Sequence, residues 1–361
     1  MKPRNIAIAC GVAGVAFGLA AAAGIVYRKQ IKSVASLKRL TDYADGYDLY
    51  AIDIAYDYDL DRIIAAGVRD DQAYIDAVMA QVLPGMPVHV QAPQFACSAF
   101  VAVDAEGRVR TGRNYDFKDD TSALLVRNHP RDGYASIGFA ALNNLGTNAP
   151  LDSVAGRTAA LMGPFAQLDG VNECGVSIAV LTLDSKPCDQ DTQRPVINTS
   201  LAIRLVLDRA ATTQDAVDLL SAYDMHAMAG RDYHFFINDA AGDARVVEWD
   251  PRDPDRACKA TPVRQVTNFY ACYADEVLPN QKNGELGHGK ERAIAIADVL
   301  DAHAGAQDEA VVRKALRAAA QEPNPDDITS NTQWSVVFDN TEPTAAITLR
   351  RHWGDIDAFA L

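Results

Sequence analysis

Residues 95–117, FACSAFVAVDAEGRVRTGRNYDF, decide the fold of this chain. An apolar run rich in strand-forming residues leads into Ala105-Glu106-Gly107-Arg108, where the glycine can supply the positive φ that tight turns need. Residues 109–117 then alternate in polarity, as a half-buried strand does. The stretch therefore predicts a β-hairpin.

The predicted hairpin brings reactive side chains together. With a turn centred between Glu106 and Gly107, residues whose numbers sum to 213 face each other. Cys97 then faces Asp116, and Arg113 lies close by. One end of the sheet would thus hold a thiol, a carboxylate and a guanidinium, which together can support nucleophilic chemistry.

Length and composition narrow the class of protein. The 361 residues are enough for one large domain or two, and 48% hydrophobic with 23% charged residues is typical of globular proteins. A net charge of −14, without a basic stripe beyond the N-terminus, argues against a nucleic-acid partner.

The histidines and cysteines indicate no metal site. The seven histidines show no i, i+4 pair and the six cysteines no C-x-x-C, so neither a metal site nor another cofactor is predicted. Four cysteines could form two disulfides in an exported domain or remain free thiols, which we favour: Cys174, Cys188, Cys258 and Cys272.

The N-terminus carries an apolar leader. Residues 6–27 contain no charge and are long enough to span a membrane, which takes about 20 residues. The length favours an uncleaved signal anchor over a signal peptide that ends in the alanine run at residues 20–23. Basic residues on both sides leave the orientation open. We expect a membrane-anchored protein with its catalytic domain outside the cytoplasmic membrane, or a secreted one if the leader is cleaved.

The remaining segments favour an α+β fold of antiparallel sheets. Residues 31–96 are too small and polar to fold alone, carry short helices at 59–66 and 70–82, and should pack on the rest. The later strands are predicted at 123–127, 134–140, 176–183, 234–238, 244–249, 265–270, 333–339 and 345–351. The later helices are predicted at 199–211 (with Thr199 or Ser200 as N-cap), 212–223, 290–304 and 308–321, and residues 143–164 as loops. Strands and helices alternate in blocks, which argues against βαβ units.

Cys97 could be a nucleophile that carries its own base. An α-amine has a pKa of about 7.7–8.0 and can accept a proton at neutral pH, whereas an internal peptide nitrogen cannot. Cleavage between Ala96 and Cys97 would create that amine. Asp116 would then orient the amine, and Arg113 would favour the thiolate. Taken alone, however, these residue types more often have a structural role: Cys97 would be a small buried residue at the start of a strand, and Arg113 and Asp116 would form a structural ion pair.

Further motifs change that balance, because together they resemble the choloylglycine hydrolase family of linear-amide hydrolases. The matching segments are Cys97-Ser98, Gly112-Arg113-Asn114-Tyr115-Asp116-Phe117, Asp169-Gly170-Val171-Asn172-Glu173-x-Gly175, Val266-Thr267-Asn268, Glu291-Arg292 and Thr332-Gln333-Trp334-Ser335-Val336-Val337. They follow the family's order from Cys97 to the C-terminus. The family comprises N-terminal-nucleophile enzymes, including bile salt hydrolases, penicillin V acylases and acid-ceramidase-like amidases.

The resemblance implies a fold and a role for each matching residue. The fold would be a four-layer αββα sandwich of antiparallel sheets. Cys97 would be the nucleophile and, through its amine, the base; Asp116 would hold the amine and Arg113 would lie beside the thiolate. Asn268 would help hold the oxyanion, and Arg292 matches an active-site arginine.

Two features depart from the best-known members. Thr182 stands near the oxyanion where they have Tyr or Asn, so neither bile-salt nor penicillin V specificity can be inherited. Asn172 is expected to brace the turn after Gly170 rather than to take a direct part in the reaction.

The second departure is the length of the N-terminal piece. In this chain 96 residues precede Cys97, as in the acid-ceramidase-like members, whose N-terminal piece stays as a separate subunit after self-cleavage. The implied organisation is a leader (1–30), a pro-segment (31–96) and an amidase domain (97–361), acting on small N-acyl amides and possible as a homo-oligomer.

Three rival hypotheses remain open. A papain-like thiol hydrolase would pair Cys97 with a histidine, for which His234 is the best candidate, although it also fits a strand-edge histidine that packs its ring. Replacing His234 by Ala should leave activity largely intact unless that dyad exists. The same fold could transfer the acyl group to an amine instead of water. An inactive, anchored binding domain is disfavoured, because Cys97, Arg113 and Asp116 are all present.

Overall fold

The computed structural model describes residues 27–84, 96–146, 151, 153–280, 286–324, 326 and 330–361. The apolar leader, apart from Tyr27, and Cys10 lie outside these residues. Within the described ranges, no helix has the length and apolar character needed to cross a membrane.

The predicted hairpin is present, with its register moved by one residue. Strand β3 (Ala96–Val103) pairs antiparallel with β4 (Val109–Asp116), and Cys97 lies opposite Tyr115 rather than Asp116. The loop is centred on Glu106, because Asp104 Oδ1 accepts from the N–H groups of Glu106 and Arg108 while Gly107 has a φ of 80°. Asp116 lies opposite Ala96, so it remains next to the predicted cleavage point.

The hairpin forms the centre of a six-stranded sheet, called sheet B here. The strand order is β14-β3-β4-β15-β16-β17, all antiparallel. The other members are β14 (Gln265–Val266), β15 (Thr332–Asp339), β16 (Thr344–Leu349) and β17 (Asp357–Ala360). Phe100 lies opposite Gly112, where a Cβ would come within 2.3 Å of the Phe100 ring, so the strand requires glycine there.

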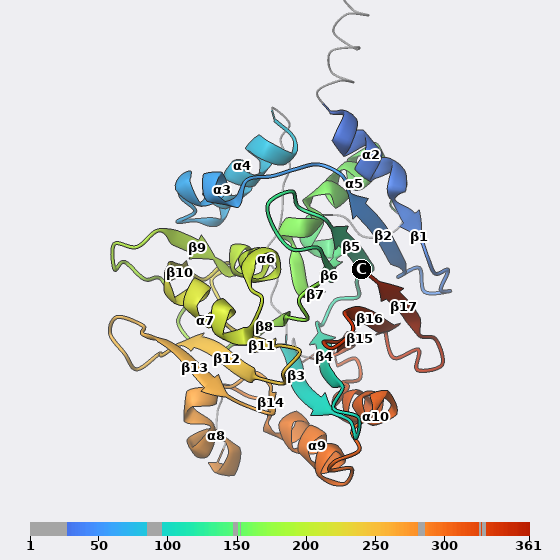
Figure 1. Cartoon of the computed structure of the whole chain (residues 1–361), viewed down its shortest axis with the longest axis vertical. Helices are drawn as coiled ribbons and strands as arrows, with labels where there is room; N and C mark the ends of the chain where they lie inside the picture. Colours follow the sequence, from blue (N-terminus) through green and yellow to red (C-terminus); the bar gives the residue numbers. More distant parts are fainter. Residues whose placement is uncertain are drawn as a thin grey trace, which may run out of the picture.

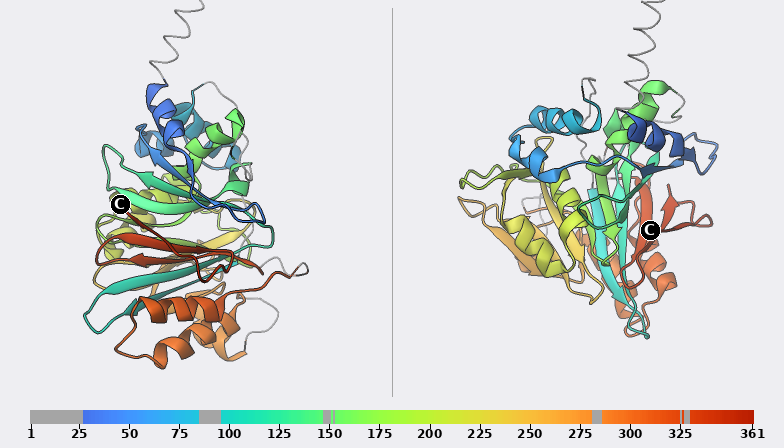
Figure 2. Two further views of the ribbon diagram at one scale, coloured as in Figure 1. Left: turned by 90° about the vertical axis from the view of Figure 1, so that its right-hand side faces the viewer. Right: turned by 45° about the horizontal axis from the view of Figure 1, so that its top comes forward.

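Helices α9 (Lys290–Asp301) and α10 (Glu309–Ala319) cover the outer face of sheet B. Four apolar side chains of α10 are buried against this sheet: Val311, Val312, Ala315 and Leu316. Figure 2 shows these helices, in orange, outside the stacked sheets. The position of α9 is important for the site, because this helix carries Arg292.

A second, nine-stranded sheet, called sheet A, packs on the inner face of sheet B. Its order is β1-β2-β5-β6-β7-β8-β11-β12-β13. Its strands are β1 (Lys38–Arg39), β2 (Leu49–Ile54), β5 (Ala123–Asn128), β6 (Ser136–Ala141), β7 (Gln167–Asn172), β8 (Ser177–Leu183), β11 (Asp232–Asn238), β12 (Ala244–Trp249) and β13 (Cys258–Pro262). Helices α6 (Thr199–Arg209) and α7 (Thr213–Ser221) contact β7, β8, β11 and β12. Figure 1 shows these helices and α10 at opposite sides of the strands. The predicted α+β sandwich of sheets is therefore confirmed.

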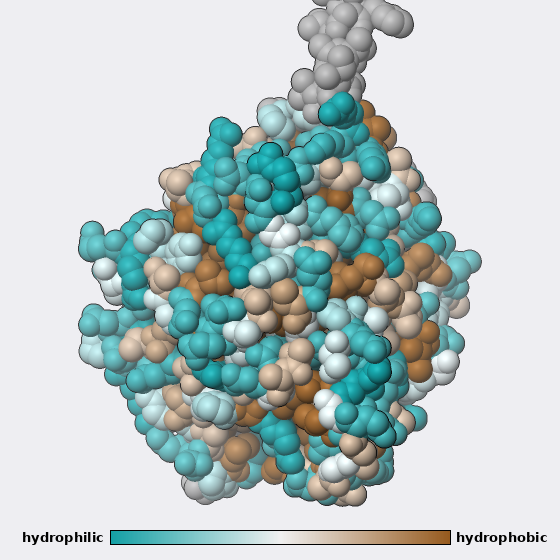
Figure 3. Space-filling view, viewed as in Figure 1, coloured by the Kyte–Doolittle hydropathy of each residue, from teal (hydrophilic) through white to brown (hydrophobic). Residues whose placement is uncertain are grey.

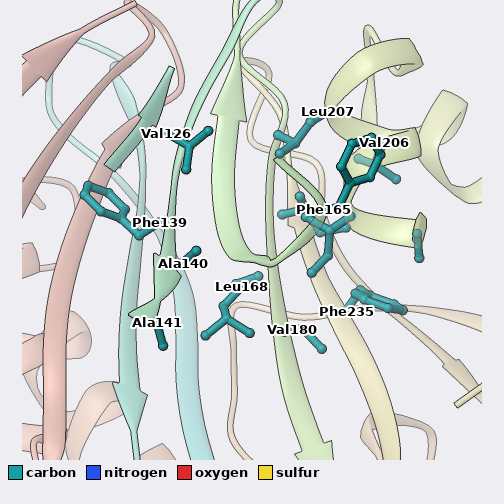
Figure 4. Packing of buried hydrophobic residues seen from close by; sticks show 14 of the residues in the cluster. Val126, Phe139, Ala140, Ala141, Phe165, Leu168, Val180, Val206, Leu207 and Phe235 are labelled. Atoms are coloured by element: carbon teal, nitrogen blue, oxygen red, sulfur yellow. The ribbon is translucent and has the colours of Figure 1, made fainter. Parts of the chain in front are cut away.

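Part of the core lies between sheet A and α6. Figure 4 shows Leu207 and Val206 of this helix beside Phe165, near the strand residues Leu168 and Val180. All five side chains are at most 6% exposed. The helix is held in place at its start by Asn198, whose side chain accepts from the N–H of Leu201; the N-cap is thus Asn198, not Thr199 or Ser200 as predicted.

The N-terminal residues form part of the same sandwich. Strand β2 pairs with β5 in parallel, from Leu49 opposite Ala123 to Ile54 opposite Asn128, which the antiparallel prediction missed. Helix α2 (Arg28–Ser36) packs on β2, whereas α3 (Leu60–Ala65) and α4 (Asp71–Val82), capped by Asp59 and Asp70, pack on each other. Residues 27–84 therefore contribute strands to the same sheet A as residues 123–262.

A few short elements also differ from the prediction. The segment expected to be loops contains η1 (Leu142–Leu145), α5 (Val154–Ala159) and η2 (Ala160–Phe165). The strands β9 (Val196–Asn198) and β10 (Asp224–His226) form a small parallel sheet. The strand predicted at 265–270 is only two residues long, after which η3 (Ala271–Tyr273) and α8 (Ala274–Asn280) follow. The irregular backbone at 267–270 is where Asn268 lies.

Candidate active site

The Cys97 thiol is enclosed between the two sheets. Cys97 is the second residue of β3, and its side chain is fully buried. Its Sγ accepts a hydrogen bond from Arg113 Nη2 at 3.2 Å. Burial raises the pKa of the Cys97 thiol to about 12, although Arg113 acts in the opposite direction. In the uncleaved chain the thiol is therefore protonated at neutral pH.

Arg113 is a buried cation held in one orientation. Its Nε lies 3.0 Å from Asp169 Oδ2, and its guanidinium carbon lies 5.1 Å from the centre of the Tyr115 ring and 5.8 Å from that of Trp334. Trp334 Nε1 in turn donates to Asp169 Oδ2 at 3.0 Å. Burial raises the pKa of Asp169, and Arg113 opposes that rise. The arrangement orients the Arg113 fork toward the sulfur.

The backbone of Cys97 is bound on both sides. Its N–H donates to Asn268 Oδ1 at 3.0 Å, and its carbonyl accepts from Arg292 Nη1 at 2.6 Å. Arg292 Nη2 also donates to Asn268 Oδ1 at 2.8 Å. Asn268 and Arg292 thus meet at Cys97, as the sequence motifs predicted for the site.

Asp116 lies beside this group, but it does not contact the nitrogen of Cys97 in the uncleaved chain. Its carboxylate lies 3.3 Å from Arg292 Nη1 and accepts from Thr332 Oγ1 at 2.6 Å and Gln321 Nε2 at 3.2 Å. Burial raises the pKa of Asp116, and Arg292 opposes that rise. The carboxylate is thus oriented by two further side chains to which the sequence analysis assigned no role.

Thr182 contributes its backbone to the site. Strand β7 pairs with β8 only as far as Ala179, so the following edge of β8 is available to side chains. Along that edge, the carbonyl of Val180 accepts from Arg113 Nη2 at 3.3 Å and that of Thr182 accepts from Asn268 Nδ2 at 2.8 Å. Among the described residues, the Thr182 hydroxyl has no hydrogen-bond partner. The structure therefore brings together all six predicted site residues, with Thr182 acting through its main chain.

Sequence reasoning missed Asp169, Trp334, Thr332 and Gln321 as parts of the site. Three of them stand in the quoted DGVNE and TQW motifs, which was the available signal. Asn172 braces the turn as expected: its Oδ1 accepts from the N–H groups of Cys174 and Val176, and its Nδ2 donates to carbonyls of α6.

His234 is engaged away from the thiol. Its Nδ1 lies 3.2 Å from Glu248 Oε2, and its Nε2 lies 3.0 Å from the carbonyl oxygen of Thr267. A papain-like dyad would need one of these nitrogens on Cys97. The geometry therefore does not support that rival hypothesis.

Metal-ligating side chains are scattered in the described ranges. There, no group of three or more His, Cys, Asp or Glu side chains is arranged to hold a metal ion. The cysteines in this part of the chain are free thiols: Cys97, Cys174, Cys188, Cys258 and Cys272.

The fold and this site define the class of protein. The structure is similar to that of a single-residue variant of the conjugated bile acid hydrolase from Clostridium perfringens, with a TM-score of 0.57 and 14% identity over 73% of this chain and 92% of that one. It is also similar to penicillin V acylase from Agrobacterium tumefaciens, with a TM-score of 0.55 and 21% identity over 73% of this chain and 86% of that one. The chain thus has the same fold as these two enzymes.

The sequence then identifies the family. The model of the family described as acyl-coenzyme A:6-aminopenicillanic acid acyl-transferase matches residues 103–352, which is more than half of the chain. The chain belongs to this family, and the resemblance to choloylglycine hydrolases is confirmed. No functionally curated protein matches the sequence.

Proposed function

We propose that the protein hydrolyses linear amide C–N bonds of N-acyl substrates, with Cys97 as an N-terminal nucleophile. One observation carries the proposal: separate partners bind the sulfur, the nitrogen and the carbonyl oxygen of this single residue. Arg113 contacts the sulfur, Asn268 the nitrogen and Arg292 the carbonyl oxygen. A purely structural cysteine would need only packing, whereas a residue that must be both nucleophile and base needs all three atoms held.

The first step is cleavage of the chain itself. Cys97 Sγ attacks the carbonyl carbon of Ala96, the C–N bond breaks, and the released nitrogen takes up the thiol proton. Water then hydrolyses the thioester between Ala96 and Sγ, which leaves a carboxylate on Ala96 and a free thiol. Asn268 favours this step, because its Oδ1 already accepts from the nitrogen that leaves. The new α-amine is a base in its neutral form; once it takes up a proton it carries a charge, which the adjacent carboxylate of Asp116 stabilises.

The mature site then acts on an external amide. The α-amine takes the thiol proton, the sulfur attacks the substrate carbonyl, and the proton passes to the leaving nitrogen. Asn268 Nδ2 has two hydrogens, of which one is used by Thr182, so the second can donate to the oxyanion. The N–H of Thr182 leaves its strand on the same side as its carbonyl and supplies another donor. One such donor is typically worth about 2.7–4 kcal/mol. Water then hydrolyses the thioester.

The N-terminal piece stays bound after cleavage. Strand β2 is hydrogen-bonded along its length to β5, which belongs to the other product. Three tyrosines on this piece also donate to it: Tyr56 to the carbonyl of Leu161, Tyr58 to Asp208 and Tyr74 to the carbonyl of Phe165. Breaking these contacts would expose a sheet edge and several buried polar groups. The mature enzyme is thus a complex of two fragments.

The leader supports a proposal for localisation. Its uncharged run of residues 6–27 fits an anchor that holds the catalytic domain outside the cytoplasmic membrane, or a signal for secretion if it is cleaved. On the face in Figure 3, hydrophilic side chains predominate and hydrophobic ones are interspersed. Separation of membranes from soluble protein, with and without residues 1–30, tests the anchor.

Acyl transfer is the second candidate, and the family's description as an acyl-transferase favours it. The thioester is the same, and an amine replaces water as the acceptor. Product analysis with glycine or hydroxylamine as competing amines decides between the two reactions. Analytical ultracentrifugation of the same preparation tests for a homo-oligomer.

The central experiment compares wild type with Cys97→Ala by intact mass, N-terminal sequencing and turnover. Penicillin V and a series of N-acyl aminomethylcoumarin amides serve as probes. Wild type should yield two co-eluting fragments, one beginning at Cys97, while the variant stays whole and inactive. A fully active wild-type preparation that is one unbroken chain across Ala96 and Cys97 would overturn the proposal.

A further inference from the structure

A second buried pair, made of an imidazole and a carboxyl group, lies behind the active site and takes no part in the proposed chemistry. His234 of β11 and Glu248 of β12 lie on neighbouring strands of sheet A, and both side chains are fully buried. Their ring nitrogen and carboxylate oxygen are 3.2 Å apart. A buried pair of this kind is costly to desolvate and does not by itself indicate a gain in stability. The other hydrogen bonds of the two side chains show which segment of the chain they hold in place.

All of these remaining contacts go to one short segment, residues 267–272. His234 Nε2 lies 3.0 Å from the carbonyl oxygen of Thr267, and because a carbonyl only accepts, this nitrogen carries a hydrogen. Glu248 accepts from the N–H of Ala271 at 3.0 Å and from that of Cys272 at 2.7 Å. The pair therefore binds the segment on both sides of Asn268. Between these contacts the segment makes only an isolated bridge, in which Phe269 pairs with Gly287 and the carbonyl of Asn268 accepts from the N–H of His288.

The segment also connects to the helix that carries Arg292. Thr267 Oγ1 donates to the carbonyl of Gly289, the N-cap residue of α9, at 2.9 Å. A Cβ on Gly289, whose φ is 88°, would come within 2.6 Å of both Thr267 Oγ1 and Arg292 Nη2. Thr267 is thus packed between the buried pair and the start of α9. A shift at Thr267 would move Asn268 and Arg292 together.

We propose that His234 and Glu248 are positioning residues that hold Asn268 at Cys97. The inference rests on the proposed function. Neither residue exchanges a proton with substrate; their effect passes through the backbone of Thr267, Ala271 and Cys272 to the Asn268 side chain. This revises the expectation that replacing His234 by Ala leaves activity largely intact, because Asn268 must lie within hydrogen-bond reach of both Cys97 and the oxyanion.

A double-mutant cycle on the full chain tests this role. The probe is p-nitrophenyl acetate, an activated ester that acylates a reactive cysteine without the natural acyl group, and the readout is the rate of p-nitrophenolate release. His234→Leu should lower this rate about 10–100-fold in the wild-type background, and Asn268→Ala about 100-fold. In the Asn268→Ala background, His234→Leu should cost less than about twofold.

Two further variants separate positioning from loss of packing. His234→Gln places an amide N–H where Nε2 was, so it should recover most of the loss by restoring the bond to Thr267. Val247→Ala removes a fully buried neighbour of Glu248 outside this network, and should lower thermal stability without reproducing the rate loss. If His234→Leu does not fold, the same cycle is run with Glu248→Gln and Asn268→Ala.

The outcomes distinguish this inference from the proposed function. Equal losses in both backgrounds would mean that His234 acts on its own, and no loss in either would mean that it does not act at all; each overturns positioning. If Cys97→Ala releases p-nitrophenolate as fast as wild type, the nucleophile is wrong and both proposals fail.

Discussion

Two buried side-chain pairs in the same sandwich differ in what the basic side chain contacts besides its acidic partner. Arg113 and Asp169 join sheet B to sheet A, and the donor left over on Arg113 contacts Cys97 Sγ. His234 and Glu248 lie side by side within sheet A, and the donor left over on His234 contacts the backbone carbonyl of Thr267. In the mechanism proposed above, the first pair would act directly on the attacking sulfur, whereas the second would act through Asn268, the residue that it positions. The role of such a buried pair can thus be inferred from the group that its basic side chain contacts besides the acidic partner.

The largest effect is expected from removing the sulfur that Arg113 contacts. Cys97→Ala should abolish both chain cleavage and turnover, because no other group in the proposed mechanism attacks a carbonyl. Intact mass and coumarin release measure the two losses. Cys188→Ala removes another buried thiol and should change neither, so cleavage that persists in the Cys97 variant would contradict the assignment.

Breaking the pair of Arg113 and Asp169 should lower the stability of the fold as well as the activity. Arg113→Met leaves the Asp169 carboxylate buried without its countercharge, which should lower the free energy of unfolding by about 3–5 kcal/mol. Adding Asp169→Leu should recover most of that stability but no activity. Urea unfolding followed by fluorescence measures both variants.

A matched control uses an exposed pair. Arg131 and Asp132 have side chains 76% and 75% exposed, so Arg131→Met should change the unfolding free energy by less than about 1 kcal/mol. Were Arg113→Met no more destabilising than this control, Arg113 would not be the buried, paired cation described here.

The environment of the thiol predicts how cleavage depends on pH. Burial raises the pKa of Cys97 to about 12 in the uncleaved chain, so the reactive thiolate becomes more abundant as the pH rises. In protein kept uncleaved by refolding at low pH, the cleavage rate should increase by up to about tenfold per pH unit between about pH 6 and 9. Intact mass against time measures this slope. A rate independent of pH would show that a neighbouring base removes the proton.

The smallest effect on the reactivity of Cys97 should come from altering the pair of His234 and Glu248. Glu248→Gln keeps the shape but weakens the acceptor for the N–H groups of Ala271 and Cys272, which should lower the unfolding free energy by about 1–3 kcal/mol. The alkylation rate of mature Cys97 by iodoacetamide should stay within about twofold of wild type, because Arg113 still sets the charge beside the sulfur. Arg113→Lys should lower that alkylation rate. If the Glu248 variant lowered it equally, the distinction between the two pairs would be lost.

Local patterns predicted much of this fold. The hairpin and the helices predicted at 59–66, 70–82, 212–223 and 308–321 all depend on residues a few positions apart, which sequence shows directly. The parallel pairing of β2 with β5 was missed because nothing local distinguishes which distant strand will accept a short apolar run. The one-residue register error arose because the side chain of Asp104 selects an odd-numbered loop.

By itself, the sequence determined the family, through the order and spacing of its motifs, and predicted the residues of the proposed site: Cys97, Arg113, Asp116, Asn268 and Arg292. Only the tertiary structure decided what orients them. Asp169, Thr332 and Gln321 became partners of Arg113 and Asp116 through contacts between distant segments, and His234 proved to lie on Thr267 instead of the thiol. The physical reason is that a side chain's chemical type is encoded at one position, whereas its hydrogen-bond partner depends on which strands meet and in which register.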